Sequence, residues 1–555
     1  MIVPSHAGDA DFLAAREAYA KGQSQRFERA AATVASDHPL RAYVDYWRMR
    51  GSEAALPDLQ AFAVRYADSP LAERARLKLA RQAGATGDWP EFERWSSQLS
   101  KPDSEIRCLA LRARGERGDA SALAEGARLH ASGADQPSSC EQLFALLHER
   151  GTLRQEDRLT RLRLALEARN LRLAHELIDA LPGDARAQSQ LLARAEREPA
   201  RLLTETPAGA VGREAALHAL GQLARSDPRQ AGAVWERVRE AYTPAEQQYG
   251  WGQIGVQAAR QADSSAAQWF ARAGTPASEF QAPWFVRSML RAGRWPDVLR
   301  GIVAMPESMQ EEAVWRYWKA RALREIGATA QANVLFARLS REIHYYGVLS
   351  GEELPVRLEQ ATRDYQPGAE ELRAMRAMPG IARALYLRRL GLNNEATTEW
   401  QWALRGMNDL QLLAASEVAR QDAWYDHAIN TADLTRDTHN FDLRYLTPYR
   451  DLAEAYSREQ GLDAAWVFGL MRQESRFVDY ARSSAGAQGL MQIMPATARW
   501  IANRLGEGRA AGRVHEPAIN IRYGTFYLKD VYSRLDNSPV LATAGYNAGP
   551  GRARR

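Results

Sequence analysis

Residues 314–339, VWRYWKARALREIGATAQANVLFARL, predict two short α-helices joined by a turn at Gly327. On each side of this glycine, apolar residues recur three and four positions apart, which is the spacing that places side chains on one face of a helix. The apolar positions are Val314, Trp315, Trp318, Ala322 and Leu323 before the glycine, and Ala332, Leu335, Phe336 and Leu339 after it. Such helix pairs are the unit of helical-repeat proteins, so the stretch favours a solenoid.

The same pattern extends outward over most of the chain. From Asp11 to about residue 350 one helical stripe follows another, and GDWPE at residues 87–91 returns as GRWPD at residues 293–297. In both, proline suits the first helical position, where a backbone N–H would lack a partner anyway. Strand and hairpin signals are nearly absent. We therefore expect a mainly all-α fold whose residues 1–365 form a long α-helical superhelix, or irregular solenoid.

A second and a third domain are expected after this superhelix. The composition shifts near residue 351 and again at Pro367. Further helical patterns follow at residues 382–390, 395–404 and 410–420. We therefore expect a helical linker domain at residues 366–440 and a last domain at residues 441–555.

Charge and hydropathy exclude some classes of protein. The chain has 555 residues, and 73 Lys and Arg against 68 Asp and Glu give a net charge of 73 − 68 = +5. So small an excess is typical of a mixed solvated surface and does not indicate nucleic acid. No stretch approaches the ~20 consecutive apolar residues of a membrane span, and the mean hydropathy is −0.47. Residues 1–6, MIVPSH, lack the features of a signal peptide, which fits either a cytoplasmic chain or a mature form.

Three residue types allow more than one interpretation. Cys108 and Cys140 form either one disulfide in an oxidising compartment or two unrelated buried thiols. The 15 tryptophans could line a sugar-binding surface, but at helical spacing we interpret them as packing residues. His427 and His439 have no further ligand pair at metal-binding spacing, so we interpret both as structural histidines.

The run DAAWVFGLMRQES at residues 463–475 predicts a helix with an acid on its apolar face. It begins with an aspartate suited to the N-cap. Val467, Leu470 and Met471 lie at i, i+3 and i+4, and Glu474 follows at i+7 on the same face. A carboxyl group held against apolar neighbours has its charged form disfavoured, so its pKa rises and it can act as a general acid. The alternative is a glutamate at a helix end that swings out to solvent.

Two glycine-rich segments follow this helix. SSAGAQGLMQIMPAT at residues 483–497 leads into a helix that begins with proline, and GYNAGPG at residues 545–551 predicts a tight turn with an aromatic residue. Glycines let a backbone approach a ligand closely. Ser483 and Gln492 can hydrogen-bond sugar hydroxyls or an N-acetyl group, and methionine offers an adaptable apolar contact. Plain turn chemistry explains either segment alone, but together with a helix-borne glutamate they indicate a carbohydrate site.

These segments together resemble the catalytic domain of the family 1 lytic transglycosylases, which is related to goose-type lysozyme. The family's motifs match Glu474-Ser475, residues 489–492 with Met494-Pro495, Asn520-Ile521 after residues 515–517, and the YNAGPG of residues 546–551. The long helical part that precedes them is similar to the large soluble members of the family.

The resemblance implies a setting and partners. It implies a lysozyme-like, α-rich catalytic domain at residues 441–555, a periplasmic location with the signal peptide removed, and a disulfide between Cys108 and Cys140. In the family this domain continues past the position of Gly551, so we expect the chain to be truncated at its C-terminus. The expected partners are peptidoglycan glycan strands and muropeptides, with no nucleic acid, no membrane span, and no metal or cofactor. The expected state is a monomer.

The resemblance also implies a reaction. The family cleaves the β-1,4 bond between N-acetylmuramic acid and N-acetylglucosamine and leaves a 1,6-anhydromuramoyl end, with Glu474 as acid and then as base. Substrate contacts are expected from Ser483, Gln492, Met494, Tyr546 and Asn547. Most glycosidases need a second carboxylate, but the matching segments contain none, and Asp479 would lie off the Glu474 face of a continuing helix. The alternatives are a lysozyme-type hydrolase of the same bond and a non-catalytic, cell-wall-binding helical scaffold.

Overall fold

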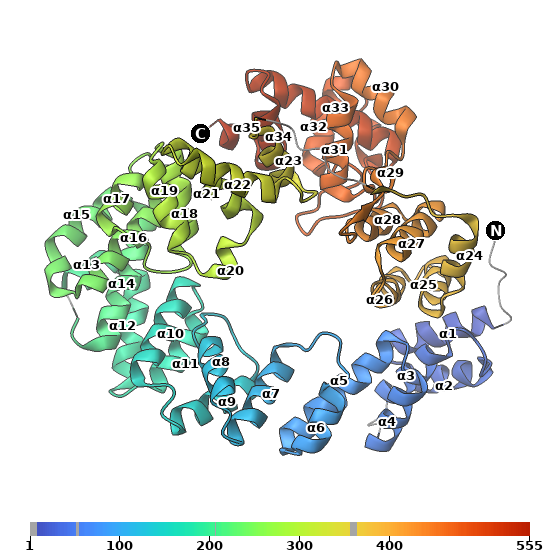
Figure 1. Cartoon of the computed structure of the whole chain (residues 1–555), viewed down its shortest axis with the longest axis horizontal. Helices are drawn as coiled ribbons and strands as arrows, with labels where there is room; N and C mark the ends of the chain where they lie inside the picture. The colour runs from blue at the N-terminus through green and yellow to red at the C-terminus, as the bar shows by residue number, and fades with distance from the viewer. Residues whose placement is uncertain (1–7, 52–54, 206, 356–362, 555) are drawn as a thin grey trace. The chain divides into compact units, whose positions relative to one another are not determined.

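The described part of the chain is built from α-helices (Figure 1). The computed structural model describes residues 8–51, 55–205, 207–355 and 363–554. Within these ranges the only strands are β1 (Arg363–Asp364) and β2 (Thr438–His439), which pair in parallel. The predicted mainly all-α fold is therefore confirmed. Over the same ranges, no helix has the length and apolar character needed to cross a membrane.

The chain divides into two compact units. One unit comprises residues 76–360, and the other comprises residues 1–75 together with residues 361–555. The N-terminal helices thus belong to the same unit as the C-terminal part of the chain. The three domains predicted at residues 1–365, 366–440 and 441–555 stay a prediction.

The unit of residues 76–360 is a series of short helices, many of which pack against the next helix in the chain. After α5 (Pro70–Thr86), which contains the unit boundary, the helices are α6 (Trp89–Ser96), α7 (Ser104–Glu116), α8 (Ala120–His130), α9 (Ser138–Glu149), α10 (Gln155–Glu167), α11 (Leu171–Asp179), α12 (Ala185–Arg197), α13 (Pro199–Glu205), α14 (Gly209–Ser226), α15 (Pro228–Val238), η1 (Arg239–Ala241), α16 (Pro244–Arg260), α17 (Ala266–Ala273), α18 (Gln281–Arg291), α19 (Trp295–Val303), α20 (Glu307–Gln310), α21 (Ala313–Glu325), α22 (Thr329–Leu339) and α23 (Tyr345–Glu352). Apolar clusters shared by neighbouring helices form its core.

The helix pair predicted at residues 314–339 is present as α21 and α22. Gly327 stands between them with a φ of 89°, a left-handed value that glycine adopts without strain. Trp315, Phe336 and Leu339 are among the predicted apolar positions that are buried. The repeated GDWPE and GRWPD segments start α6 and α19 one residue earlier than expected, so each proline is the second helical residue.

The tryptophans pack inside the helical layers. None of the 15 is exposed, and seven are buried. The buried ones are Trp47, Trp95, Trp235, Trp251, Trp315, Trp400 and Trp424. The interpretation of these residues as packing residues is therefore confirmed for the buried seven.

The other unit joins the N-terminal helices to the C-terminal part. Its helices are α1 (Asp9–Ala20), α2 (Ser24–Thr33), α3 (Arg41–Gly51), α4 (Leu56–Arg65), α24 (Ala369–Ala377), α25 (Pro379–Arg389), α26 (Asn393–Ala403), α27 (Asp409–Gln421), α28 (Tyr425–Ala432), α29 (Phe441–Arg444), α30 (Arg450–Gln460), α31 (Ala464–Ser475), α32 (Pro495–Leu505), η2 (Gly508–Arg513), α33 (Pro517–Arg534), α34 (Pro539–Ala548) and α35 (Pro550–Ala553). The buried Glu399 of α26 accepts a hydrogen bond from Tyr43 of α3 at 3.0 Å and pairs with Arg383 at 3.1 Å. Arg383 also pairs with Asp68 at 2.8 Å, so one charged cluster ties together segments more than 300 residues apart.

His427 and His439 are both held by packing and polar contacts within this unit. The His427 ring stacks on Trp424 with centroids 3.7 Å apart, and its Nδ1 lies 2.9 Å from an Asp426 carboxylate oxygen. The His439 Nδ1 lies 2.9 Å from the Thr435 hydroxyl. These contacts agree with their interpretation as structural histidines.

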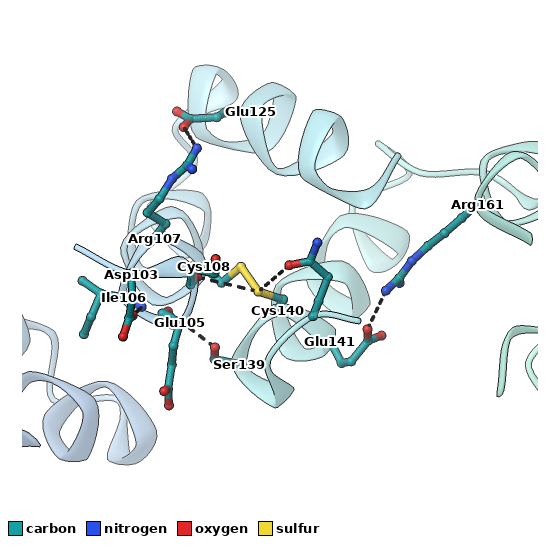
Figure 2. Close-up of a disulfide and its surroundings, with 12 residues drawn as sticks. Asp103, Glu105, Ile106, Arg107, Cys108, Glu125, Ser139, Cys140, Glu141 and Arg161 are labelled. Carbon is teal, nitrogen blue, oxygen red and sulfur yellow. Dashed lines mark hydrogen bonds and ion pairs between the residues drawn. A yellow bond between two sulfur atoms is a disulfide. The ribbon is translucent and has the colours of Figure 1, made fainter. Parts of the chain in front are cut away.

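Cys108 of α7 and Cys140 of α9 form a disulfide, as the resemblance implied (Figure 2). Both residues are buried, and their Cα atoms are 5.0 Å apart. Beside the bond, the Ser139 hydroxyl donates a hydrogen bond to the backbone carbonyl of Glu105 at 3.4 Å. The disulfide therefore joins two helices at a point where they already pack together.

We predict that thiol titration of the denatured, unreduced protein finds no free thiol. Replacing both cysteines by alanine should lower the free energy of unfolding by about 3–4 kcal/mol, because the bond restricts the unfolded chain across a loop of this length. Urea denaturation of the Cys108→Ala/Cys140→Ala variant beside the unreduced wild type measures this loss. Detection of two free thiols in the wild-type protein would contradict the assignment.

Candidate active site

Helix α31 carries Glu474 on its apolar face. The Asp463 carboxylate accepts a hydrogen bond from a backbone N–H of the first turn at 2.7 Å and so caps the helix. Val467, Leu470 and Met471 are buried, and Glu474, one turn further on, is half-buried. The structure thus places the carboxyl on the face that the sequence pattern predicted.

Burial raises the pKa of the Glu474 carboxyl above its ordinary value of 4.5. Among the described residues, no neighbouring carboxylate or cation contributes to this shift, and none forms an ion pair with Glu474. The group can therefore stay protonated closer to neutral pH than a solvated glutamate does. A general acid requires that property.

The end of α31 differs from the prediction. We expected Asp479 on a continuing helix, but the helix ends at Ser475, where Arg476 and Phe477 adopt left-handed φ values of 48° and 65°. Such values are unfavourable for residues with a Cβ, and the burial of the Phe477 side chain offsets part of that cost. Asp479 lies in the following loop, with its Oδ2 3.5 Å from the Tyr449 hydroxyl.

The loop after α31 folds back on itself around Gly489. The Gly489 N–H donates to the Ala481 carbonyl at 2.9 Å, and Gln488 and Ile493 exchange two backbone hydrogen bonds of 3.1 and 3.0 Å. Gly489 has a φ of 75°, and a Cβ at this position would lie 2.3 Å from Nδ2 of Asn520. Only glycine therefore fits here without displacing its neighbours.

Asn520 of α33 holds this loop from inside the domain. Its side chain is fully buried, and its Nδ2 donates to the Gln488 carbonyl at 2.8 Å and to the Val514 carbonyl at 2.6 Å. Its Oδ1 accepts from the Met491 N–H at 2.7 Å. One amide thus satisfies three backbone groups, which is how buried polar groups are stabilised. We call residues 488–491 the pinned turn.

Two further helices hold the next carbonyls of the pinned turn. The Ser475 hydroxyl, at the end of α31, donates to the Leu490 carbonyl at 2.7 Å. The Tyr546 hydroxyl, on α34, donates to the Met491 carbonyl at 2.8 Å. Because Ser475 directly follows Glu474, the pinned turn is attached beside the residue that carries the carboxyl group.

Tyr546 and Asn547 lie in the last turn of α34, whereas the sequence predicted a tight turn over residues 545–551. The chain turns instead at Gly549, with a φ of 85°, between α34 and α35. Tyr546 is buried, and its pKa is raised well above 10 by burial first and by the negative charge of Glu474 second. The Glu474 carboxyl is therefore close enough to raise the pKa of the phenol, while Asn547 is exposed.

The other predicted substrate contacts lie along the loop. The Ser483 hydroxyl oxygen accepts from the Ala487 N–H at 3.0 Å, and the Gln492 Nε2 donates to the Gly489 carbonyl at 2.8 Å. Both polar side chains thus help to hold the loop itself. Met494 caps the start of α32 and keeps 40% of its surface exposed, so its side chain is open to a ligand.

A groove of about 440 Å³ lies beside the loop. It is lined by Asp479, Tyr480, Ala481, Arg482, Gln488, His515, Glu516 and Pro517. Neither this groove nor the hydrogen bonds of Asn520 could be predicted from local sequence patterns, because both join segments that are distant along the chain. The only sequence signal for them was the position of residues 515–517 and Asn520 within the matched motifs.

Two family models match this part of the chain. Residues 451–555 match a Transglycosylase SLT domain, and residues 374–433 match a Soluble lytic murein transglycosylase L domain. The first match contains Glu474 and the pinned turn. The second covers helices that precede the site in the same compact unit.

Relatives and solved structures match over almost the whole chain. The soluble lytic murein transglycosylase of Salmonella typhimurium is 26% identical, over 93% of this chain and 82% of that protein, and the Escherichia coli K12 protein is 25% identical over the same shares. An inactive glutamate-to-glutamine mutant of the lytic transglycosylase Slt from Pseudomonas aeruginosa superposes with a TM-score of 0.74 at 28% identity, covering 99% of this chain and 91% of that chain. The 70 kDa soluble lytic transglycosylase from Escherichia coli, with a TM-score of 0.64 at 23% identity over 99% and 90% of the two chains, has the same fold.

We predict that Asn520→Ala lowers the free energy of unfolding by about 3 kcal/mol, because the Met491 N–H and the Val514 carbonyl, both buried contacts, lose this partner and the Gln488 carbonyl keeps only Ile493. Urea denaturation of the full chain measures the loss. Asn503→Ala, which changes an exposed asparagine on α32, is the matched control and should stay within about 0.5 kcal/mol of wild type. An Asn520 variant as stable as this control would show that the pinned turn does not depend on the amide.

We also predict that Glu474→Gln stabilises the folded protein at neutral pH. The folded-state pKa of Glu474 is raised, so folding disfavours the carboxylate, and the wild type loses stability as pH rises from 4.5 through the raised value. The amide carries no such charge. The melting temperature of the variant should exceed that of wild type at pH 7, and the difference should vanish below pH 4.5.

The exposed Glu459 of α30 provides the control for this measurement, since the melting curves of Glu459→Gln should follow those of wild type at each pH. A wild type more stable than Glu474→Gln at pH 7 would contradict the account of the buried carboxyl.

Proposed function

Since the chain belongs to the soluble lytic transglycosylases, we propose that it cleaves the glycan strands of peptidoglycan, with Glu474 as the group that transfers the proton. The proposal rests on the environment of Glu474. Glu474 is half-buried on the apolar face of α31, its pKa is raised by burial, and it lies in the part of the chain that matches a transglycosylase domain. The inactivity of the glutamate-to-glutamine mutant of the Pseudomonas aeruginosa neighbour supports an essential glutamate.

The first step is proton donation to the leaving oxygen. The bond that breaks is the β-1,4 bond between C1 of N-acetylmuramic acid and O4 of N-acetylglucosamine. The protonated Glu474 carboxyl donates its proton to O4 while positive charge develops at C1. The raised pKa keeps part of the carboxyl in the acid form at the pH where the bond is cut.

The second step supplies the nucleophile from the substrate itself. A glycosidase that uses water pairs two carboxyl groups, whereas no second carboxylate influences the titration of Glu474 among the described residues. The muramoyl C6 hydroxyl attacks C1 and gives its proton to the Glu474 carboxylate, so one C–O bond forms, one breaks, and the enzyme returns to its starting state. Attack within one sugar has a high effective concentration. The product carries a 1,6-anhydromuramoyl end.

The remaining predicted residues have three kinds of role in the proposed reaction. Met494 and Asn547 are exposed at the loop and the end of α34, so they contact the sugar directly. Ser483 and Gln492 shape the loop through their hydrogen bonds and present their remaining polar capacity to the sugar. Tyr546 holds the pinned turn beside Glu474, since its hydroxyl donates a hydrogen bond to the Met491 carbonyl.

The setting follows from the substrate. Peptidoglycan strands and muropeptides are the partners, and the periplasm is the location, with the chain acting as a monomer. We include the domain limits of residues 1–365, 366–440 and 441–555 in this proposal. They are supported by the two family matches, since residues 374–433 fall inside the linker and residues 451–555 inside the catalytic domain.

Glu474→Gln tests the proposal most simply. The amide keeps the shape of the side chain but can neither donate nor accept the proton, so release of soluble muropeptides from purified sacculi should fall by a factor of about 1,000 or more. Glu459→Gln should keep wild-type turnover. A Glu474 variant with activity within about tenfold of wild type would remove this residue from the mechanism.

A further inference from the structure

The compact unit that does not contain Glu474 has a cavity of about 170 Å³. It lies among α10, α14 and α16, and α14 packs against both of the others (Figure 1). One water molecule needs roughly 10–15 Å³ of such space, so the cavity has room for a ligand group the size of several waters. Gly221 of α14 lines it, and a Cβ there would meet only the Gln253 Oε1, at 3.6 Å.

The acids inside the cavity already have partners. Glu214 is buried and receives two hydrogen bonds from the Arg163 guanidinium, at 2.6 and 2.9 Å. Glu167 accepts from the Ser278 hydroxyl at 2.8 Å and from the Gln253 amide at 3.0 Å. Neither carboxylate needs a cation from a ligand.

The arginines at the mouth of the cavity, unlike these acids, are exposed to solvent. Arg169, Arg225 and Arg260 line the cavity and are exposed, and among the described residues neither Arg225 nor Arg260 pairs with a carboxylate. The lining holds four arginines against two glutamates, and Arg169 also pairs with Glu196 outside the lining at 4.0 Å, so the excess is 4 − 3 = +1.

These mouth arginines lie at or just past the C-terminal ends of α10, α14 and α16, where cations stabilise a helix. Stabilisation of the helix ends, however, neutralises only part of the charge of these arginines. Arg169 also pairs with Glu196 at 4.0 Å. Each helix end contributes roughly −0.5 of a unit charge, so the ends of α14 and α16 offset only about half of the charges of Arg225 and Arg260. The mouth keeps a net positive charge that favours an anion, and arginine binds carboxylates, as it does phosphates, in a two-pronged geometry.

Apolar and amide groups complete the lining. Leu166 and Leu217 lie on the walls, Gln257 offers an amide, and Phe280 lies at the cavity with 37% of its surface exposed. A ligand that matches this lining has a carboxylate, hydrogen-bonding amides and small apolar side chains. A short acidic peptide has all three.

We propose that this cavity binds the carboxylate-bearing stem peptides of peptidoglycan, through Arg225 and Arg260, as a second recognition site apart from the carboxyl that cuts the glycan. The inference rests on the proposed function for the identity of the peptide. The cavity would then engage the peptide part of a strand, while Glu474 acts on its sugar part.

Isothermal titration of the full wild-type chain with a sugar-free peptide, L-alanyl-γ-D-glutamyl-meso-diaminopimelyl-D-alanine, tests the site without any turnover. We expect Arg225→Gln/Arg260→Gln to weaken binding at least about tenfold, because two charge-assisted contacts are lost. Gly221→Leu should weaken it similarly by filling the cavity with the charges intact. The same peptide with its carboxylates amidated should bind at least tenfold more weakly to wild type.

The matched control is Arg186→Gln/Arg237→Gln, which removes two exposed arginines of the same unit outside the cavity and should leave the Kd within twofold of wild type. Equal binding of the amidated peptide, a Kd of the Arg225/Arg260 variant within twofold of this control, or no wild-type binding at millimolar peptide would each overturn the inference. Lysis of sacculi by the wild-type chain is measured separately, so a failure of the proposed function appears there and not in the titration.

Discussion

The hydrogen bonds that three helices make to the pinned turn are the constraint on which the site depends. Asn520 binds three backbone groups, and Ser475 and Tyr546 each bind one more carbonyl. Three of these contacts, those of the Met491 N–H, the Met491 carbonyl and the Val514 carbonyl, are buried, and a buried group that loses its partner costs about 1–3 kcal/mol, so the turn has one favoured conformation. Because Ser475 is next to Glu474, the bond that fixes the turn also fixes the end of the helix that carries the carboxyl.

The position of Glu474 then explains its chemistry. A solvated glutamate would be ionised at neutral pH, whereas burial keeps this one closer to its acid form at a cost to the stability of the fold. In the proposed reaction the same group serves as acid and then as base, which agrees with a pKa shift that comes from burial and not from a neighbouring carboxylate. Tyr546 is close to Glu474, and because its hydroxyl is bound to the Met491 carbonyl, we assign it a positioning part in the proposed reaction.

Local sequence patterns predicted the helices of this structure. The features that they did not predict depend on contacts between distant segments of the chain. The all-α fold, the α21–α22 pair, the N-cap at Asp463 and the face of Glu474 follow from spacing within one helix, and the structure contains each of them. Two predictions were wrong: that a helix continues to Asp479, and that residues 545–551 form a tight turn. A buried Phe477 and the packing of α34 override the local pattern there. The contact of Glu399 with Tyr43 and the bonds of Asn520 join distant segments, and no single stretch of sequence contains that information.

In the proposed reaction, one carboxyl group and the substrate's own C6 hydroxyl suffice to cut the strand. Digestion of purified sacculi by the wild-type chain in heavy-oxygen water, followed by mass analysis of the released muropeptides, tests it most directly. We expect 1,6-anhydromuramoyl ends that contain no label, because water takes no part in the proposed reaction. Muramoyl reducing ends that carry the heavy oxygen would contradict it and would show that water attacked C1.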